Sequence, residues 1–472
     1  MARDERIDLC IIGAGPAGIA AAEQAAAREA RVVLVEGGEL GGVSHNWGSL
    51  PAQALAAAAE RAHAIRTARD LGVGADEPRI NFARVNTRIR TAIDEANPNV
   101  SAEHLEAQGI EVVRGRARFT GPSAIEVEGR AIRAANFLVA TGSRPVVPTV
   151  PGLDGVPYFT PETIFEVTRR PSHLIVVGGG ATGLALAQSH LRLGCPVTLI
   201  EMLEPLDDQD PEMAQAVLRR LRAEGLEVRE HTGVVAISSV ADEIAVDVKA
   251  GPNEDRIVGS HLLFATGRRP DFDGLGLDAA KVRMAGDVPA LGRFGRTSNR
   301  RIFVAGDAAG QVGTHAARHG AHMAVDAMMG GRSGHGAVVP RIVHIRPAIA
   351  WIGMTESEAR TRHGNKFEVV RAGFSQTDAA HAQAEANGHV KVLVGPRGTI
   401  LGAGIVGPHA EELIAVLALA MSGKMGLDKI ERLVVPHPSF SQAIALAAAQ
   451  YARTRGGNAR SGWRAALKRL LP

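Results

Sequence analysis

The sequence predicts an α/β protein that contains two Rossmann-like dinucleotide-binding domains. Three observations lead to this class. At the N-terminus, a strand, a glycine-rich turn, a helix and a second strand ending in an acid follow one another. The same pattern starts again at Leu174. The chain has 472 residues, which is enough for about two to four domains, each with its own core.

The first copy begins with the apolar segment IDLCII, which leads into the turn GAGPAG and an alanine-rich helix. Gly13 permits the tight turn, Gly15 lets the backbone approach a pyrophosphate, and Gly18 lets helix and strand pack closely. The helix N-terminus then faces the phosphates. The next strand, RVVLVE, ends at Glu36, whose carboxylate can bind a ribose hydroxyl pair. This order favours a nucleotide site over a purely structural turn.

The second copy starts with LIVVGGGATG, which contains Gly178, Gly180 and Gly183, and continues through a helix to the strand PVTLIE. That strand ends at Glu201. An acid at this point favours the free 2′-hydroxyl of NAD, because it would repel a 2′-phosphate, which would instead require arginine. The sequence therefore predicts NADH rather than NADPH.

Three further strands end in residues that suit a nucleotide site. FLVATGSRP ends with Thr141 and Gly142, and LLFATGRRP has Gly267 at the equivalent turn. The strand RIFVAGDAAG places Asp307 after Gly306, where a short acid could hold a sugar or ribityl hydroxyl. For Asp307, a plain helix cap is the structural alternative.

Charge and cysteine content exclude some classes of function. Basic residues exceed acidic ones by 53 − 50 = +3, but six of the basic residues lie in the last twenty positions. Without them the balance is 47 − 50 = −3, so the body of the chain is not a nucleic-acid binder by charge.

Cys10 and Cys195 are predicted to be buried thiols rather than a disulfide. The N-terminus MARDERIDLC does not resemble a signal peptide, and a cytoplasmic protein is expected.

Together these motifs resemble the pyridine nucleotide-disulfide oxidoreductases, a family that includes dihydrolipoamide dehydrogenase, glutathione reductase, mercuric reductase and soluble transhydrogenase. The late segments RPAIAWIGMTESEA, ILGAGIVGPHAEELI and PHPSFSQA strengthen the resemblance, which covers about residues 5–450. It implies an FAD domain split around an inserted NAD domain, then a C-terminal α+β interface domain that forms a homodimer. The implied ranges are 1–150 and 271–337 for FAD, 151–270 for NAD, 338–450 for the interface domain and 451–472 for a basic tail.

The resemblance also implies which residues bind the cofactors. For FAD these are Gly13, Gly15, Pro16, Ala17, Gly18, Glu36, Thr141, Gly142 and Asp307. For NADH they are Gly178, Gly180, Gly183 and Glu201. Further cofactor-binding candidates are Gly41, Gly42, Gly267, Gly306 and Thr314. The helix that starts near Thr314 would point its backbone amides at the pyrimidine edge of the flavin and stabilise negative charge there.

The loop GGVSHNWGSLPAQAL, residues 41–55, matches the active-site segment of the family. In that segment, two cysteines with four residues between them form a redox disulfide, and a lysine follows on the next helix. Here those places hold Ser44, Ser49 and Gln53. A serine hydroxyl cannot form a disulfide or a thiolate, so dithiol chemistry at this loop is excluded by atom type.

Two other departures agree with this loss. The family's general base is a histidine in a His-Pro segment of the partner subunit, and a glutamate five residues later orients it. His437 is kept, but Gln442 stands in the glutamate's place and brings no charge. Ala185 occupies the position of a glutamate that usually pairs with the missing lysine. Losing both charges together avoids an unpaired buried one.

These residues predict an FAD enzyme that accepts hydride from NADH and passes electrons to a non-disulfide acceptor such as a quinone, a dye or oxygen. Ser44, His45, Ser49 and the partner's His437, with Gln442 beside it, would line the open flavin face. A solvent-facing role for His45 and a purely structural one for His437 stay open. Soluble transhydrogenase is the alternative enzyme, since it shares Trp47-Gly48 by resemblance, and a non-catalytic scaffold or redox sensor is the alternative of another class.

Two C-terminal features are less specific. His315, His319 and His322 have helical spacing, but no cysteine or carboxylate joins them, so helix packing is favoured over a metal site and no metal is predicted. The tail GWRAALKRLLP predicts a short basic amphipathic helix. It could dock onto the protein's own dimer or make peripheral contact with an anionic membrane, so membrane association remains open.

Overall fold

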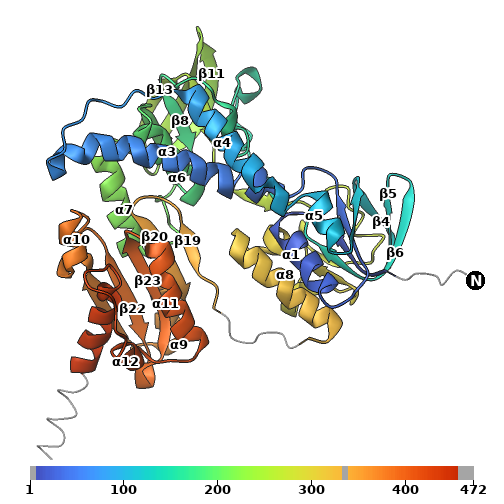
Figure 1. Cartoon of the computed structure of the whole chain (residues 1–472). Helices are drawn as coiled ribbons and strands as arrows, with labels where there is room; N and C mark the ends of the chain where they lie inside the picture. The colour runs from blue at the N-terminus through green and yellow to red at the C-terminus, as the bar shows by residue number, and fades with distance from the viewer. Residues whose placement is uncertain (1–6, 332–337, 455–472) are drawn as a thin grey trace, which may run out of the picture. The chain divides into compact units, whose positions relative to one another are not determined.

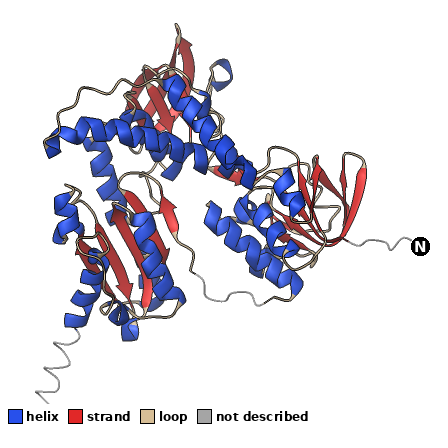
Figure 2. Ribbon diagram, viewed as in Figure 1, coloured by secondary structure: helices blue, strands red, loops and turns tan. Residues whose placement is uncertain are grey.

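The computed structural model describes residues 7–331 and 338–454. The chain divides into two compact units, one of residues 1–202 and 227–335 and the other of residues 203–226 and 336–472. Figure 1 follows the helices and strands of each unit along the chain, and Figure 2 shows that each unit combines sheets with packed helices.

The first unit contains a seven-stranded sheet in the order β3-β2-β1-β6-β5-β4, with β18 also paired to β6. β1 is parallel to β2 and β6. Leu9 and Ile11 of β1 share one core with the helices α1 and α8, while Cys10 points into the core on the other face, as in a parallel strand covered on both sides. The elements are β1 (Ile7–Ile12), α1 (Pro16–Ala26), β2 (Val32–Glu36), β3 (Ile110–Arg114), β4 (Ala117–Gly121), β5 (Ala124–Val127), β6 (Arg130–Val139), β18 (Ile302–Val304) and α8 (Thr314–Met329).

A second parallel sheet of the same unit has the order β10-β9-β8-β14. Its strands are β8 (Leu174–Val177), β9 (Val197–Ile200), β10 (Glu227–Arg229) and β14 (His261–Phe264), with α6 (Ala181–Arg192) after β8. An antiparallel sheet made of β11 (Gly233–Val240), β12 (Glu243–Ala250) and β13 (Asn253–Gly259) shares apolar core residues with it. The short strands β7 (Ser143–Pro145) and β15 (Arg268–Pro270) pair where the two Ala-Thr-Gly segments leave their sheets.

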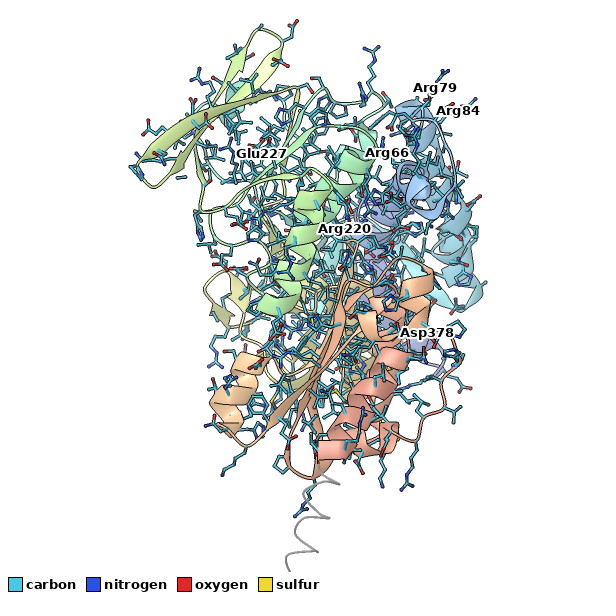
Figure 3. All side chains as sticks on the ribbon, turned by 90° about the vertical axis from the view of Figure 1, so that its left-hand side faces the viewer. Arg66, Arg79, Arg84, Arg220, Glu227 and Asp378 are labelled. Atoms are coloured by element: carbon cyan, nitrogen blue, oxygen red, sulfur yellow. The ribbon has the colours of Figure 1, made fainter. Side chains whose placement is uncertain are left out.

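A long helix, α3 (Ser49–Thr67), packs against α6 and against α4 (Phe82–Ala96). Near its C-terminus Arg66, labelled in Figure 3, donates a hydrogen bond to the carbonyl of Arg192, the last residue of α6, and pairs with Glu77 at 2.5 Å. The helix that follows the serine loop is therefore tied to the Rossmann helix of the second sheet.

The second unit is built on a five-stranded antiparallel sheet in the order β19-β20-β23-β22-β21. Helix α11 packs against β20 and β23, and the helical residues 442–454 add Ala443, Ile444 and Tyr451 to the same core. The elements are α7 (Pro211–Ala223), β19 (Arg341–Val343), β20 (Ala348–Gly353), α9 (Glu356–His363), β21 (Glu368–Gly373), α10 (Asp378–Ala382), β22 (His389–Val394), β23 (Ile400–Gly407), α11 (Ala410–Ser422) and α12 (Leu427–Ile430).

A buried lysine joins three elements of this unit. Lys391 of β22 places its Nζ 2.8 Å from Asp210, the N-cap of α7, 3.1 Å from Glu212 and 2.8 Å from Glu356 of α9. Burial alone would lower the pKa of Lys391, but hydrogen bonds to Asp210 and Glu356 raise it above the usual value. The lysine therefore stays charged, and this ion cluster anchors α7 to the sheet.

The structure confirms the predicted fold class, an α/β fold with two Rossmann-like domains and a C-terminal α+β domain. The exact domain boundaries given above stay predictions. The basic tail lies outside the described residues, apart from its first four positions, 451–454.

Candidate active site

The first glycine turn lies between β1 and α1 and is open at its centre. Gly13 has a φ of 105°, and a Cβ there would lie 2.3 Å from the carbonyl oxygen of Ala140, so only glycine fits. A Cβ on Gly18 would lie 1.8 Å from the Gly13 oxygen, so its absence allows the helix to approach the strand. By contrast, a Cβ on Gly15 would meet only the Gly42 Cα, at 4.0 Å. This bare stretch of backbone fits a pyrophosphate.

The second turn, between β8 and α6, repeats this arrangement. Gly178 has a φ of 111°, and its Cβ would lie 2.4 Å from the Ala265 oxygen. Gly183 would meet the Gly178 oxygen at 1.9 Å. Nothing lies within 4 Å of a Cβ built on Gly180. Both turns therefore combine two glycines required by packing with a third that borders open space.

The two strand-end acids are also placed alike. The Glu36 carboxylate accepts a hydrogen bond from the Ala14 N–H at 2.5 Å, and the Glu201 carboxylate accepts one from the Gly179 N–H at 2.6 Å. Each acid is thereby held beside its glycine turn, where a nucleotide's ribose would lie.

The first Ala-Thr-Gly segment has an unused polar atom. Thr141 Oγ1 is buried, and no residue in the described part of the chain gives it a hydrogen-bond partner. Nothing lies within 4 Å of a Cβ built on the next residue, Gly142, or on Gly267 of the second segment. A buried hydroxyl beside open space needs a partner, and a bound cofactor would supply one.

Asp307 is held by a chain of polar side chains. Ser143 donates its hydroxyl to the Asp307 carboxylate at 2.8 Å, and Arg268 donates Nε–H to the Ser143 oxygen at 2.8 Å. Arg268 also pairs with Glu162 at 2.6 Å. Asp307 lies in the short 3₁₀ turn that follows β18, so its carboxylate is positioned at a strand tip by residues of both Ala-Thr-Gly segments.

The serine loop packs directly on the first glycine turn. Gly41 and Gly42 have φ angles of 87° and 60°, and a Cβ on Gly42 would lie 2.8 Å from the Gly15 Cα. The chain then forms the short helix α2 (Gly42–Asn46) and enters α3. The glycine pair thus allows the loop to lie against the turn at which a pyrophosphate would bind.

The loop's two serines and a threonine form a chain of hydroxyl groups. Ser44 Oγ donates to Ser49 Oγ at 3.2 Å and shares a hydrogen bond of 2.5 Å with Thr314 Oγ1. Thr314 is the first residue of α8, so the chain runs from the exposed Ser49 to the N-terminus of that helix. Gln53 is exposed one turn further along α3. The structure brings Ser44, Ser49 and Thr314 together.

Two neighbours in the loop lie outside this hydroxyl chain. The His45 ring places Nε2 2.8 Å from Asn97 Oδ1, so its side chain is engaged with the segment after α4. The Trp47 side chain is 37% exposed. His45 is therefore tethered to Asn97 rather than to the serines.

In the second unit, His437 is approached from two sides. Its Nδ1 lies 3.0 Å from Nε2 of Gln442, and its Nε2 lies 3.5 Å from Asp378 Oδ2 at the start of α10. His437 and Asp378 are both mostly exposed in the single chain. Sequence reasoning identified His437 and Gln442 but missed Asp378.

Comparison with known protein families gives the decisive observation. The model of the pyridine nucleotide-disulphide oxidoreductases matches residues 7–331, and the model of that family's dimerisation domain matches residues 339–448. The chain belongs to this family.

Two relatives match this chain over most of its length. A dihydrolipoyl dehydrogenase of Thermus scotoductus is 35% identical over 456 residues, which are 93% of this chain and 96% of that protein. A mercuric reductase of Streptomyces lividans is 33% identical, over 93% of this chain and 95% of that protein. The crystal structure of LpdA from Mycobacterium tuberculosis has a TM-score of 0.86 at 24% identity, over 94% of this chain and all of that one, and shows the shared fold.

Membership settles the broad chemistry. The chain is a flavoprotein oxidoreductase of the pyridine nucleotide-disulphide family, whose members use FAD and NAD(P)H. Its matched dimerisation domain indicates a homodimer. Within residues 7–331 and 338–454, the structure contains no helix of sufficient length and apolar character to span a bilayer.

The protein's two cysteines lie outside the serine loop in the sequence. Cys10 is in the middle of β1 and Cys195 precedes β9; both are buried and unpaired, as the sequence predicted. Burial raises the pKa of each thiol to about 12. A thiol with so high a pKa is a poor nucleophile near neutral pH.

The three histidines of the HAARHGAH segment lie on α8. Burial lowers the pKa of His322 below its usual value, with the nearby Arg318 adding to the effect. Among the described residues, no group of three or more His, Cys, Asp or Glu side chains has a metal-binding arrangement.

Three polar features escaped sequence reasoning: the Ser44–Thr314 hydrogen bond, the Lys391 cluster and the Asp378–His437 contact. In each, the partners are far apart in the sequence and follow no periodic pattern. The alignment of Asp378 with His437 depends on how α10 packs near the segment around Phe440, whose ring lies 5.6 Å from that of Phe374. No sequence motif predicts such a contact.

Proposed function

We propose that this protein is an NADH-dependent flavoprotein that passes electrons from bound FAD directly to a non-disulfide acceptor, with a quinone as the acceptor class. The observation that carries the proposal is the pair of hydroxyls at Ser44 and Ser49, 3.2 Å apart, in the loop that by resemblance corresponds to the redox-cysteine segment of the family. Oxygen in a hydroxyl cannot take up the electron pair that a disulfide accepts. Electrons that reach FAD must therefore leave without a dithiol relay.

The cofactor would be held by residues of the first unit. Gly13, Gly15 and Gly18 would receive the FAD pyrophosphate, Glu36 its ribose, and Asp307 the ribityl chain. When bound, FAD supplies a ring that accepts two electrons from NADH and gives them to a second substrate. The protein's own residues orient the rings and exclude water.

NADH is favoured over NADPH by the end of β9. The Glu201 carboxylate is fixed by the Gly179 N–H at 2.6 Å, and the next residues in the chain, Met202 and Leu203, are exposed and apolar. A 2′-phosphate at this point would meet the Glu201 carboxylate, and neither of the next two residues in the chain is an arginine that could pair with it. A 2′-hydroxyl can instead donate a hydrogen bond to Glu201.

The hydroxyl chain gives the acceptor a source of hydrogen bonds and protons. Ser44 lies between the exposed Ser49 and Thr314, so a proton can pass along three oxygen atoms that are already in contact. A quinone needs protons as it gains electrons, and the overall reaction is NADH + H⁺ + quinone → NAD⁺ + hydroquinone. The partner's His437 would approach the same acceptor from across the dimer.

An anaerobic experiment tests this proposal in two stages. The purified FAD-loaded protein is mixed with NADH or NADPH, and the flavin absorbance is followed by stopped flow. We expect NADH to bleach the flavin at lower concentration than NADPH does. No bleaching by either nucleotide would contradict the proposal and favour a non-catalytic scaffold or sensor.

The second stage identifies the acceptor. The reduced protein is mixed with a quinone, with thio-NAD⁺, with oxygen or with lipoamide, and the return of flavin absorbance is compared. We expect fastest reoxidation by the quinone and none by lipoamide above the background rate. Preferential reoxidation by thio-NAD⁺ would support transhydrogenation instead, and turnover with lipoamide would contradict the absence of a dithiol function.

A further inference from the structure

The two ring nitrogens of His437 face partners of opposite hydrogen-bonding character. On one side is the Asp378 carboxylate, 3.5 Å from Nε2; on the other is the amide nitrogen of Gln442, 3.0 Å from Nδ1. Asp378, labelled in Figure 3, is the first residue of α10, while His437 and Gln442 belong to the PHPSFSQA segment. All three lie in the second unit, so their contacts are internal to it.

These partners select one tautomer of the imidazole. A carboxylate only accepts hydrogen bonds, so it favours a proton on Nε2. A neutral imidazole has a single ring proton, which leaves a lone pair on Nδ1. The Gln442 amide N–H can donate to that lone pair. Turning the amide over would bring its oxygen to Nδ1 and would match the opposite tautomer, but it would then compete with Asp378 for the one proton.

We propose that Asp378 and Gln442 hold His437 as its Nε2–H tautomer, so that the ring presents a hydrogen-bond donor at Nε2 rather than a base. A glutamate at position 442 would accept a hydrogen bond from Nδ1–H and leave Nε2 with a lone pair. With Gln442 in place of that acid and Asp378 on the other nitrogen, Nε2 donates a hydrogen bond instead of offering a lone pair. Asp378 acts here as a positioning residue.

The length of the Asp378 contact suits this role. At 3.5 Å it exceeds the 2.7–3.2 Å typical of a hydrogen bond from N–H to oxygen, so the carboxylate orients the Nε2 proton without engaging it fully. The His437 side chain is 61% exposed in the single chain, and a carbonyl oxygen can therefore reach that proton.

This inference rests on the proposed function in one respect, namely that His437 meets the acceptor at the partner's flavin. It adds a substrate class: an uncharged carbonyl acceptor that takes a hydrogen bond from Nε2–H. The nearby Asp378 charge would repel an anionic acceptor. A neutral quinone should consequently be a better substrate than a sulfonated one of similar reduction potential.

The tautomer can be measured without any activity. The full-length FAD-loaded protein is labelled with ¹⁵N in its histidine rings, and the His437 signals are identified by their loss in His437→Gln. At pH 8, where an unperturbed imidazole is neutral, the ¹⁵N shifts report which nitrogen carries the proton. We expect the Nε2–H form in the native protein, a fall of about threefold in its ratio to the Nδ1–H form in Asp378→Asn, and the Nδ1–H form in Gln442→Glu.

Asp428→Asn is the matched control. Asp428 also lies in the first turn of a short helix, α12, and it also has a long ion pair, 3.9 Å to Lys429. This substitution should leave the His437 signals unchanged. An Nδ1–H form or a doubly protonated ring in the native protein would overturn the proposal, as would equal effects of Asp378→Asn and Asp428→Asn.

A kinetic measurement separates this inference from the proposed function. In Asp378→Asn, kcat/KM for the sulfonated quinone should rise about threefold relative to that for the neutral quinone, because one nearby negative charge is removed. An unchanged ratio would contradict the assigned acceptor class. If the native protein shows the Nε2–H tautomer but no quinone turnover, the proposed function fails while the tautomer assignment stands.

Discussion

At the scale of single residues, Gly178 and Gly180 lie two positions apart in one turn but have different surroundings. Gly178→Ala would force a φ of 111° on alanine and place a Cβ 2.4 Å from a backbone oxygen, so we expect it to destabilise the first unit by about 2–4 kcal/mol. Gly180→Ala has no neighbour within 4 Å and an ordinary φ of −72°, so it should fold normally. It should nevertheless weaken NADH binding about tenfold or more, because its methyl group enters the pyrophosphate position.

Thermal unfolding and NADH titration of both variants check this prediction. Each variant is the control for the other, because both replace glycine by alanine and only the surroundings of the two positions differ. Equal unfolding midpoints for the two variants would show that the Gly178 position is not strained. Unchanged NADH affinity in Gly180→Ala would show that the open side of the turn does not face the nucleotide.

The hydroxyl chain leads to a second prediction at this scale. Ser44→Ala removes both the bond to Ser49 and the bond to Thr314. Because no electron passes through Ser44 itself, the rate of flavin reduction by NADH should stay within about twofold of the native rate. Reoxidation by the quinone should slow roughly tenfold, the effect of losing about 1.4 kcal/mol of proton-transfer or hydrogen-bond stabilisation. Stopped-flow measurement of the two half-reactions separates these effects, and a slowed NADH step alone would contradict the assignment.

At the scale of elements, the Lys391 cluster determines how α7 is attached to β22 and α9. Lys391→Met leaves Asp210 buried without its cation, and breaking a buried pair in this way costs about 3–5 kcal/mol. The exposed Lys429, with one ion pair at 3.9 Å, is the matched control, and Lys429→Met should change stability by less than about 0.5 kcal/mol. The free energy of unfolding of both variants can be measured by urea unfolding, followed by the fluorescence of Trp351, which is buried in β20 of the same unit. Equal midpoints for the two variants would refute the anchoring role.

The same cluster predicts a pH dependence. Hydrogen bonding from Arg371, and further from Lys391, lowers the pKa of Glu212 from 4.5 to about 2. A lowered folded-state pKa stabilises the folded state above the unfolded value, and this contribution is lost as the pH falls from about 4.5 towards 2. Glu212→Gln should therefore be less stable than the native protein at pH 6, and the difference should shrink on acidification. A constant difference in urea midpoint between about pH 6 and pH 3 would contradict this coupling.

The elements that the sequence predicted best are those with local signals. Gly13, Gly178 and the acids Glu36 and Glu201 follow from fixed spacing after an apolar strand, and the structure has both turns where that spacing requires them. The contact of Ser44 with Thr314 and that of Lys391 with Asp210 had no such signal. Each joins side chains brought together only by tertiary packing, which a single sequence does not encode in a readable pattern.

At the scale of the whole molecule, His437 lies within the matched dimerisation domain. We therefore expect each active site to combine the cofactor-binding residues of one subunit with His437 of the other. If His437 acts at the partner's flavin, a subunit without His437 can still have a complete site when its partner subunit contains His437. This can be tested with two variants that are each impaired for a different reason. His437→Gln removes the imidazole, and Gly180→Ala weakens the NADH site.

Mixing these two variants under conditions that exchange subunits should restore activity. Random pairing makes about half of the dimers mixed, and each mixed dimer has one site with an intact NADH turn facing an intact His437, so about a quarter of all sites become competent. NADH:quinone turnover should therefore rise to about a quarter of the native rate, at an NADH concentration too low to saturate Gly180→Ala. Size-exclusion chromatography confirms that dimers are present, and the unmixed variants give the baseline. Activity equal to the mean of the two unmixed variants would place His437 at the flavin of its own chain, or at no flavin at all.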